Sequence, residues 1–303
     1  MKNSTDHNPH YIGVTGIKFR EHGKQAVAIA KAEGLGEDTI RGMIGVISGP
    51  DTFNPAWPNM SSKPHRMPWK AETVGDILVA VQDPAIIPMI HMEVEKDGPD
   101  FGTNTWEKRD GNMSGTYALE ALTWLQHHFE ITPAIQINGV ASAADIQKLA
   151  QITLVVIQMR NEIINNPPRE VIPYLQDATK GVQGRIKILL DPSAGVGAQF
   201  DPEAAIGWEE IIRTEVPDCN NFGYAGGLRP NKESEEKIAA LIAARARRFG
   251  GDGRDVSVDV ETGVILPGRE MNEPLIAETV DTRPGGLYQQ YLEHMMRAYG
   301  WKK

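Results

Sequence analysis

The sequence predicts a (β/α)8 barrel, in which eight parallel strands alternate with helices and close into a ring. Eight short apolar runs alternate with helix-like segments along the 303 residues, and eight is the number that closes a barrel. Most of these runs end in acids, glycines or hydroxyl residues, as parallel strands do when they carry functional groups to one end of a sheet. Because no stretch is rich enough in Pro, Gly or Ser to divide the chain, we expect one barrel domain over residues 1–303.

The strands and helices are expected where the apolar pattern has the matching length and period. The predicted strands are Tyr11–Thr15, Met43–Ser48, Ile86–Glu93, Ala134–Asn138, Thr153–Gln158, Ile186–Asp191, Asn221–Ala225 and Val256–Val260. The predicted helices are Gly23–Gly34, Lys70–Val81, Thr116–Phe129, Ala143–Ala150, Pro168–Ala178, Glu203–Thr214, Lys232–Phe249 and Tyr288–Tyr299. Ser142 is an expected N-cap, and Gly250 is an expected helix stop.

Three long connections each follow a predicted strand: Gly49–Lys70, Glu95–Gly115 and Ile265–Leu287. They are therefore expected on the C-terminal, functional face of the barrel. Loops of this length are usually lids, binding loops or assembly surfaces. A homo-oligomer is accordingly left open.

The composition excludes several classes of protein. Hydrophobic residues make up 41% of the chain and charged residues 23%, which suits a folded core. The net charge of −9 argues against a nucleic-acid binder. No run of about 18 apolar residues predicts a membrane span, and the polar N-terminus has no apolar signal segment. With one cysteine, Cys219, no disulfide framework is expected. We expect a cytoplasmic protein without a cofactor.

Polar residues two apart share one face of a strand, and several predicted strand ends carry such pairs. We expect these side chains to form a polar ring inside the barrel mouth. The alternative is that some point outward into loop contacts or satisfy the barrel's own hydrogen bonds. The pairs are His91 and Glu93, Gln136 and Asn138, Gln158 and Arg160, and Asp259 and Glu261, while Thr15, Ser48 and Asp191 end three further strands.

Metal binding is a weaker interpretation of the same ring. His91, Glu93, Asp259 and Glu261 are residue types that ligate zinc or harder divalent ions. No His-x-His or His/Cys spacing accompanies them, so no metal site is predicted.

The stretch from Lys187 to Gly268 carries the most specific motifs. It contains Leu-Leu-Asp ending at Asp191, then a glycine turn with Phe200-Asp201, then Ala-Gly-Gly-Leu-Arg-Pro over residues 225–230, then Val-Asp-Val-Glu-Thr-Gly-Val over 258–264. In order and spacing this stretch resembles the phosphoribosylanthranilate isomerases of tryptophan biosynthesis. The resemblance weakens toward the N-terminus, where residues 14–17 and 135–139 are similar to the family's first and fourth strands.

The resemblance implies a general acid and places a different residue at the family's base position. Asp191 matches the aspartate that protonates the opening ribose ring in an Amadori rearrangement. A carboxyl in a partly dry pocket can hold a proton near neutral pH; the alternative is an aspartate that caps the following glycine turn. Thr15 stands where the family has its cysteine base. A hydroxyl is too weak a base without an activating partner, so Glu93, His91 or Glu261 would have to take that role.

The family's phosphate site is only partly matched. In the family, backbone amides of two turns hold the substrate phosphate, and these turns match Gly226-Gly227 and Thr262-Gly263. Glu261 replaces the first serine of the second turn. Its carboxylate would oppose a phosphate unless it points away or pairs with a cation such as Arg229 or Arg269.

Substrate binding is predicted for Arg66, Asn138, Arg160 and Asp259. Arg66 matches the family arginine that contacts the anthranilate carboxylate, although an insertion separates the motifs and a solvated loop arginine is the alternative. Asn138 stands where the family has a histidine.

Three functions follow. The first is an isomerase or lyase acting on a small, sugar-phosphate-like substrate. The second is a genuine phosphoribosylanthranilate isomerase with a relocated base. The third is a non-catalytic binding or assembly protein on the same scaffold, because one fold hosts many functions. The polar strand ends favour an enzyme, and Thr15 counts against the second function.

Overall fold

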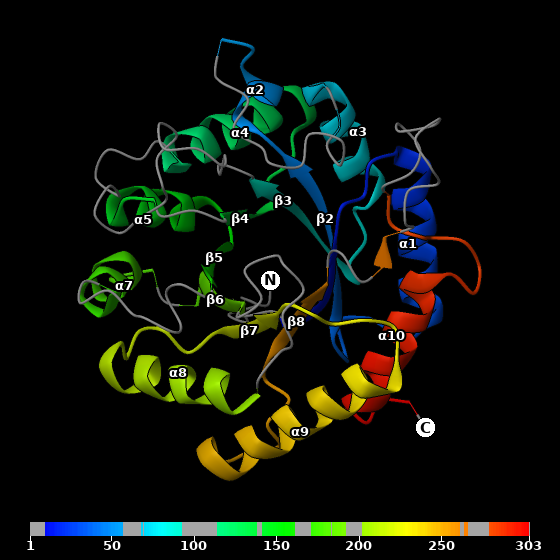
Figure 1. The fold of residues 1–303 in the computed structure, drawn as a ribbon. Helices are drawn as coiled ribbons and strands as arrows, with labels where there is room; N and C mark the ends of the chain where they lie inside the picture. Colours follow the sequence, from blue (N-terminus) through cyan, green and yellow to red (C-terminus); the bar gives the residue numbers. More distant parts are fainter. Residues whose placement is uncertain are drawn as a thin grey trace.

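The computed structural model is a closed barrel of eight parallel strands in the order β1 to β8, surrounded by helices (Figure 1). It describes residues 10–56, 68, 70–92, 114–137, 141–160, 171–182, 184–191, 202–260, 264–265 and 279–302. The strands are β1 Tyr11–Thr15, β2 Arg41–Ser48, β3 Ile86–Met92, β4 Ala134–Ile137, β5 Val155–Arg160, β6 Ile186–Asp191, β7 Phe222–Ala225 and β8 Ser257–Val260. The helices are α1 Arg20–Ala32, α2 Pro50–Phe53, α3 Ala71–Ala80, α4 Ser114–Phe129, α5 Ala143–Ile152, α7 Val171–Thr179, α8 Pro202–Glu215, α9 Lys232–Phe249 and α10 Leu287–Ala298. The predicted fold class is confirmed.

The predicted element ends agree with the structure within a few residues where a local signal marks them. The Ser142 side chain accepts a hydrogen bond from the Asp145 amide at the start of α5, as expected of an N-cap. Helix α9 ends at Gly250, whose φ of +82° favours glycine. Helix α1 begins at Arg20, three residues before the prediction, after an N-cap residue whose side chain makes no capping bond. The short helix α2 was not predicted.

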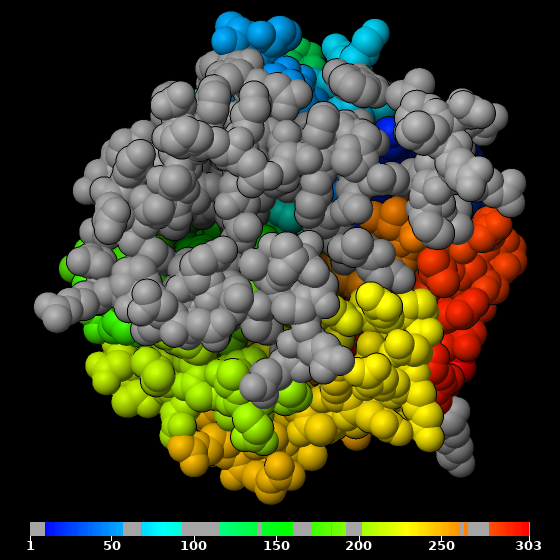
Figure 2. All heavy atoms as spheres, in the orientation of Figure 1, coloured from blue at the N-terminus to red at the C-terminus, as the bar shows by residue number. Residues whose placement is uncertain are grey.

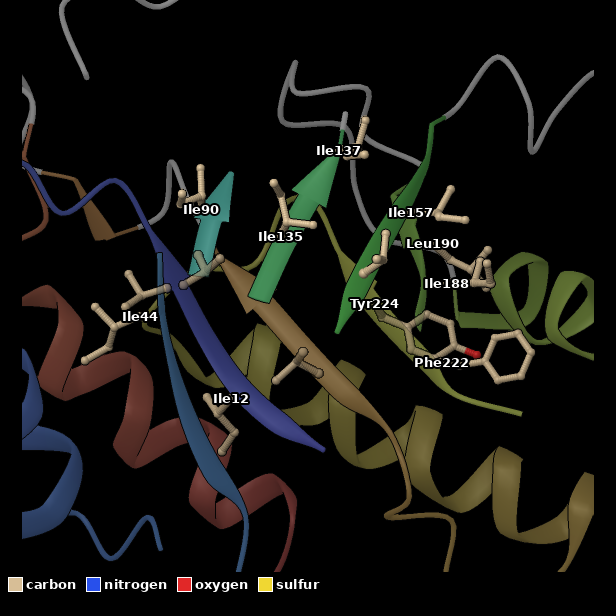
Figure 3. Close-up of a cluster of buried hydrophobic side chains, with 14 of the residues drawn as sticks. Ile12, Ile44, Ile90, Ile135, Ile137, Ile157, Ile188, Leu190, Phe222 and Tyr224 are labelled. Carbon is tan, nitrogen blue, oxygen red and sulfur yellow. The ribbon is translucent and has the colours of Figure 1, made fainter. Parts of the chain in front are cut away.

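Side chains alternate between two apolar layers along each strand. The outward layer packs against the helices and includes Ile44, Ile90, Ile135, Ile188 and Phe222 (Figure 3). The inward layer fills the barrel and is formed by Tyr11, Met43, Ile87, Met89, Ala134, Val156, Leu189 and Ala225. Because both faces of each strand are buried, the strands read as nearly continuous apolar runs.

The barrel closes between its first and last strands. The Tyr11 amide donates a hydrogen bond of 3.0 Å to Ser257 Oγ across 246 residues of sequence. Helices α9 and α10 lie side by side at the rim (Figure 2). Near the end of the chain, Lys302 Nζ contacts Glu33 Oε2 at 2.5 Å. None of the described helices has the length and apolar character needed to cross a membrane.

A buried charge network joins α8, β7, α9 and the segment before β8. Arg245 donates two 2.8 Å hydrogen bonds to the two carboxylate oxygens of Glu209, and another to Asp255. Tyr224 also donates to Glu209, and the Arg213 guanidinium contacts Glu209 and lies 4.9 Å from the Phe222 ring. We call these residues the buried charge network. Glu209 and Arg245 are almost completely buried, so each charge depends on the other for stabilisation.

A buried lysine lies near this network, inside the barrel. Lys187, at the start of β6, is fully buried and donates a hydrogen bond to Asn221 Oδ1, and its Nζ lies 5.1 Å from the centroid of the Tyr11 ring. Burial, and then the charge of Arg245, lower the pKa of Lys187 from 10.5 to about 7. Desolvation therefore favours the neutral amine in the folded protein.

Lys187 should make the stability of the folded state rise with pH. Above about pH 7 the folded protein loses this proton, while the unfolded chain keeps it up to about pH 10.5. The unfolded state then binds more protons, so stability rises with pH by up to about 1.4 kcal/mol per unit. We expect Lys187→Met to remove this slope between pH 7 and pH 9 in urea unfolding. The exposed Lys180→Met is the control, and equal slopes in all three proteins would refute the assignment.

Candidate functional site

Four polar side chains occupy neighbouring strands on the inward face at the C-terminal end of the barrel, which we call the mouth. They are His91 on β3, Gln136 on β4, Gln158 on β5 and Asp191 on β6, and we call them the polar arc. Their inward orientation follows from strand parity, because the alternate residues of these strands, such as Ile90, belong to the outward layer. His91, Gln136 and Asp191 are buried, with exposed fractions of 3%, 2% and 4%.

Three members of the polar arc are joined by hydrogen bonds, and the fourth, His91, lies next to them in the sheet. His91 and Gln136 are partners in the register of β3 and β4. Gln136 Nε2 donates a hydrogen bond of 3.3 Å to Gln158 Oε1, and Gln158 Nε2 donates one of 2.7 Å to Asp191 Oδ2. The structure thus places two predicted catalytic residues, His91 and Asp191, at opposite ends of the polar arc.

Thr15 is the last residue of β1, lies on the inward face of the barrel and is fully buried. Its Oγ1 has no hydrogen-bond partner among the described residues. A Cβ on Gly45 of β2 would stand 3.0 Å from this atom. The described surroundings of Thr15 therefore contain no group that activates its hydroxyl as a base.

Asp259 lies on the inward face of β8, because its neighbours Val258 and Val260 belong to the outward layer. It is paired in register with Gly13 of β1 and Ala225 of β7. Its Oδ1 lies 2.8 Å from the position that a Cβ would take on Gly13, so the missing side chain of this glycine makes room for the carboxyl group. Asp259 stays a predicted substrate-binding residue.

The two glycines of the predicted phosphate site directly follow β7. Gly226 and Gly227 have φ angles of +94° and +66°, which favour glycine over residues with a side chain. Asn231 then caps α9 by accepting a hydrogen bond from the Ser234 amide. Neither glycine carries a side chain of its own that would hinder the approach of an anion to this backbone.

The C-terminal end of β2 does not contribute to the expected polar ring. Ser48 shares its face with Ile44 and Val46, which pack in the outward layer. The inward residue at this position is Ile47. A Cβ on Gly16 would lie within 4 Å of Ile47, Ile265 and Val280, so this side of the mouth carries apolar side chains.

Several predicted site residues lie outside the described part of the chain. These are Glu93 and Glu261 as catalytic candidates, Arg66 and Asn138 as substrate-binding candidates, Thr262 and Gly263 in the phosphate site, and the side chain of Arg160.

Two polar residues near the mouth were not among the predicted functional residues. Gln158 was noted only as a strand end, and its contact with Asp191 depends on the diagonal offset between β5 and β6, which the sequence does not display. Lys18 follows β1 and is only 4% exposed, with its Nζ 5.9 Å from the centroid of the Phe19 ring. A single lysine after a strand gives no sequence signal of burial.

No cluster of three or more His, Cys, Asp or Glu side chains suited to a metal ion occurs among the described residues.

Comparisons with known proteins agree with this geometry at the level of the fold. No family model and no curated protein matches the sequence. Among solved structures, the chain is similar to a phosphoribosyl anthranilate isomerase from Thermus thermophilus, with 16% identity, a TM-score of 0.51, and coverage of 96% of this chain and 98% of that chain. It is also similar to one from Thermotoga maritima, with 16% identity, a TM-score of 0.52, and coverage of 97% and 99%. The chain shares their fold. The resemblance predicted from the sequence is confirmed to that extent.

Proposed function

We propose that this protein is a barrel enzyme of the isomerase or lyase type that acts on a small, sugar-phosphate-like substrate by general acid–base catalysis. The observation that supports the proposal most directly is the polar arc. It holds the Asp191 carboxyl on the inward face, at the C-terminal end of β6. The C-terminal end of a barrel is where enzymes of this fold place their chemistry.

Asp191 is the proposed acid and His91 the proposed base among the described residues. A neutral imidazole has a nitrogen lone pair that can accept a proton from carbon. In the proposed step, His91 removes a proton from the carbon next to a carbonyl or imine. The electron pair forms a carbon–carbon double bond, and Asp191 protonates the oxygen or nitrogen that receives the charge. Glu93 and Glu261 are the alternative bases.

Deuterium exchange tests this reaction class without requiring that the substrate be known. Proton removal by a base makes the carbon-bound hydrogen of a substrate exchange with D2O. We expect the protein to catalyse this exchange in at least one member of a panel of aldose and ketose phosphates, followed by ¹H NMR. A panel without any exchange would favour the non-catalytic alternative.

A separate assay with phosphoribosylanthranilate as the substrate distinguishes the proposal from phosphoribosylanthranilate isomerase itself. The described surroundings of Thr15 offer no activating group, and loss of a general base costs on the order of 10² to 10⁴ in rate. We therefore expect weak or no turnover of phosphoribosylanthranilate. Rapid turnover would show that another residue supplies the base.

A phosphate on the substrate would bind the backbone amides around Gly226 and Gly227. We expect phosphate or sulfate at millimolar concentration to raise the melting temperature beyond the effect of chloride, because a ligand of the native state stabilises it. Gly227→Val should remove this specific rise, since φ of +66° is strained for a β-branched residue.

Gly181→Val is a matched control, because Gly181 also has a positive φ and lies away from the mouth, after α7. Absence of any anion-specific rise in the wild type would indicate an unphosphorylated substrate.

A further inference from the structure

The side chain of Gln158 hydrogen-bonds to a neighbour on each side within the polar arc. Its Nε2 donates to Asp191 Oδ2 at 2.7 Å, and its Oε1 accepts from Gln136 Nε2 at 3.3 Å. The three residues come from three consecutive strands, β4, β5 and β6, whose backbones are fixed by the barrel ladder. The side chain of Gln158 is thus held between two anchored neighbours.

These partners determine which way the Gln158 amide faces. A glutamine amide has two hydrogen-bond donors on nitrogen and an acceptor oxygen. If the amide turned over, its oxygen would face the Asp191 carboxylate and its nitrogen would face the donor nitrogen of Gln136. While Asp191 is ionised and Gln136 keeps its observed orientation, both contacts would then be repulsive, so these two partners favour the orientation in which Gln158 donates to Asp191.

The fixed amide makes the two oxygens of Asp191 unequal. Oδ2 accepts the hydrogen bond from Gln158, which lowers its affinity for a proton relative to Oδ1. In this arrangement the proton of the acid form is favoured on Oδ1. A hydrogen bond to one oxygen also fixes the plane of the carboxyl group, and general acid catalysis depends on such positioning.

At the Gln136 end of this row of hydrogen bonds, one acceptor atom has no partner in the described part of the chain. Gln136 Oε1 is buried and has no hydrogen-bond partner among the described residues. A buried acceptor without a partner costs free energy unless a ligand or water satisfies it. Gln136 lies beside His91 in register, so a substrate held between His91 and Asp191 would bring a hydroxyl or amine hydrogen to this oxygen.

We propose that Gln158 is a positioning residue that orients the Asp191 carboxyl, and that Gln136 holds Gln158 in place while its Oε1 accepts a hydrogen bond from a hydroxyl or amine of the substrate. The inference rests on the proposed function for its catalytic meaning. The hydrogen-bonded arrangement itself can be tested independently.

The first test concerns the arrangement and needs no substrate. The side-chain amide protons of Gln158, assigned with Gln158→Met, should be shifted downfield and exchange slowly with water in ¹H–¹⁵N spectra. Gln136→Met should bring the shift and the exchange rate toward those of the exposed Gln151. If the Gln158 amide already behaves like Gln151 in the wild type, or does not respond to Gln136→Met, the inference is overturned whatever the activity.

The second test uses the deuterium-exchange reaction on the substrate that it identifies. We expect Gln158→Met to lower kcat about 10- to 100-fold with little change in KM, because Gln158 acts through Asp191. Gln136→Met should raise KM as well, because it loses a contact to the substrate. Gln151→Met is the control for a glutamine-to-methionine change.

A double variant separates positioning from a general structural role. If Gln158 acts only through Asp191, Gln158→Met should cost nothing further in an Asp191→Asn background. An equal loss in both backgrounds would overturn the inference. A loss for Asp191→Asn together with wild-type kcat for Gln158→Met would refute the inference and leave the proposed function intact.

Discussion

Asp191→Asn should reduce the rate of the proposed reaction by a factor of about 10² to 10⁴, which is the usual contribution of a general acid. Asparagine keeps the shape of the side chain at the end of β6 but has no acidic proton to deliver. The rate of deuterium exchange, measured by ¹H NMR, checks this expectation. The melting temperature should change little, because the strand ladder that holds this position is unchanged.

The control is Asp177→Asn, which makes the same chemical change on an exposed face of α7. It should leave the exchange rate unaltered. If Asp191→Asn instead melts several degrees lower and keeps its turnover per folded molecule, Asp191 is a structural cap and the proposed acid is wrong.

Glu209→Ala should produce the largest loss of stability. It leaves Arg245, with an exposed fraction of 1%, buried without its carboxylate partner, and removes the acceptor of Tyr224 as well. Breaking a buried pair on one side costs about 3–5 kcal/mol. Urea unfolding at pH 7 measures the loss. The adjacent Glu210→Ala is the control, because Glu210 makes an exposed contact with Arg248 and should matter little.

The effect of Glu209 should also depend on pH. Burial raises the pKa of this carboxyl, but hydrogen bonds from Arg245 and Tyr224 outweigh burial and hold the pKa below its usual 4.5. A lowered folded-state pKa gives stability that is present above the unfolded pKa and lost as pH falls through the folded value. The difference between wild type and Glu209→Ala should therefore shrink in acid. A constant difference would mean that packing, not charge, accounts for the loss.

The fold was largely predictable because its signals are local. Strands buried on both faces give continuous apolar runs such as Ile186–Asp191, and caps such as Ser142 and stops such as Gly250 mark helix ends. The start of α1 was misplaced because Phe19 makes no side-chain cap there. Helix α2 has only four residues, too few for a period to show.

The candidate site was predictable only in part. Strand parity correctly predicts that His91 and Asp191 share the inward face at the mouth, because their neighbours are outward apolar residues. Parity alone does not identify the residue that touches Asp191, because that contact follows the offset of one strand against the next. Ser48 shows that a polar residue at a strand end does not by itself indicate the inward face. It ends a strand with a hydroxyl, yet its register places Ile47 inward.

The hydrogen bond from the Tyr11 amide to Ser257 has a consequence for how the protein is made. The partner strand of β1 on this side is separated from it by 246 residues. During synthesis, β1 therefore leaves the ribosome long before β8 exists, and one edge of the growing sheet stays unpaired for most of translation. Unpaired strand edges attract other strands, and such distant pairings form slowly. The nascent chain should consequently depend on chaperones until β8 emerges.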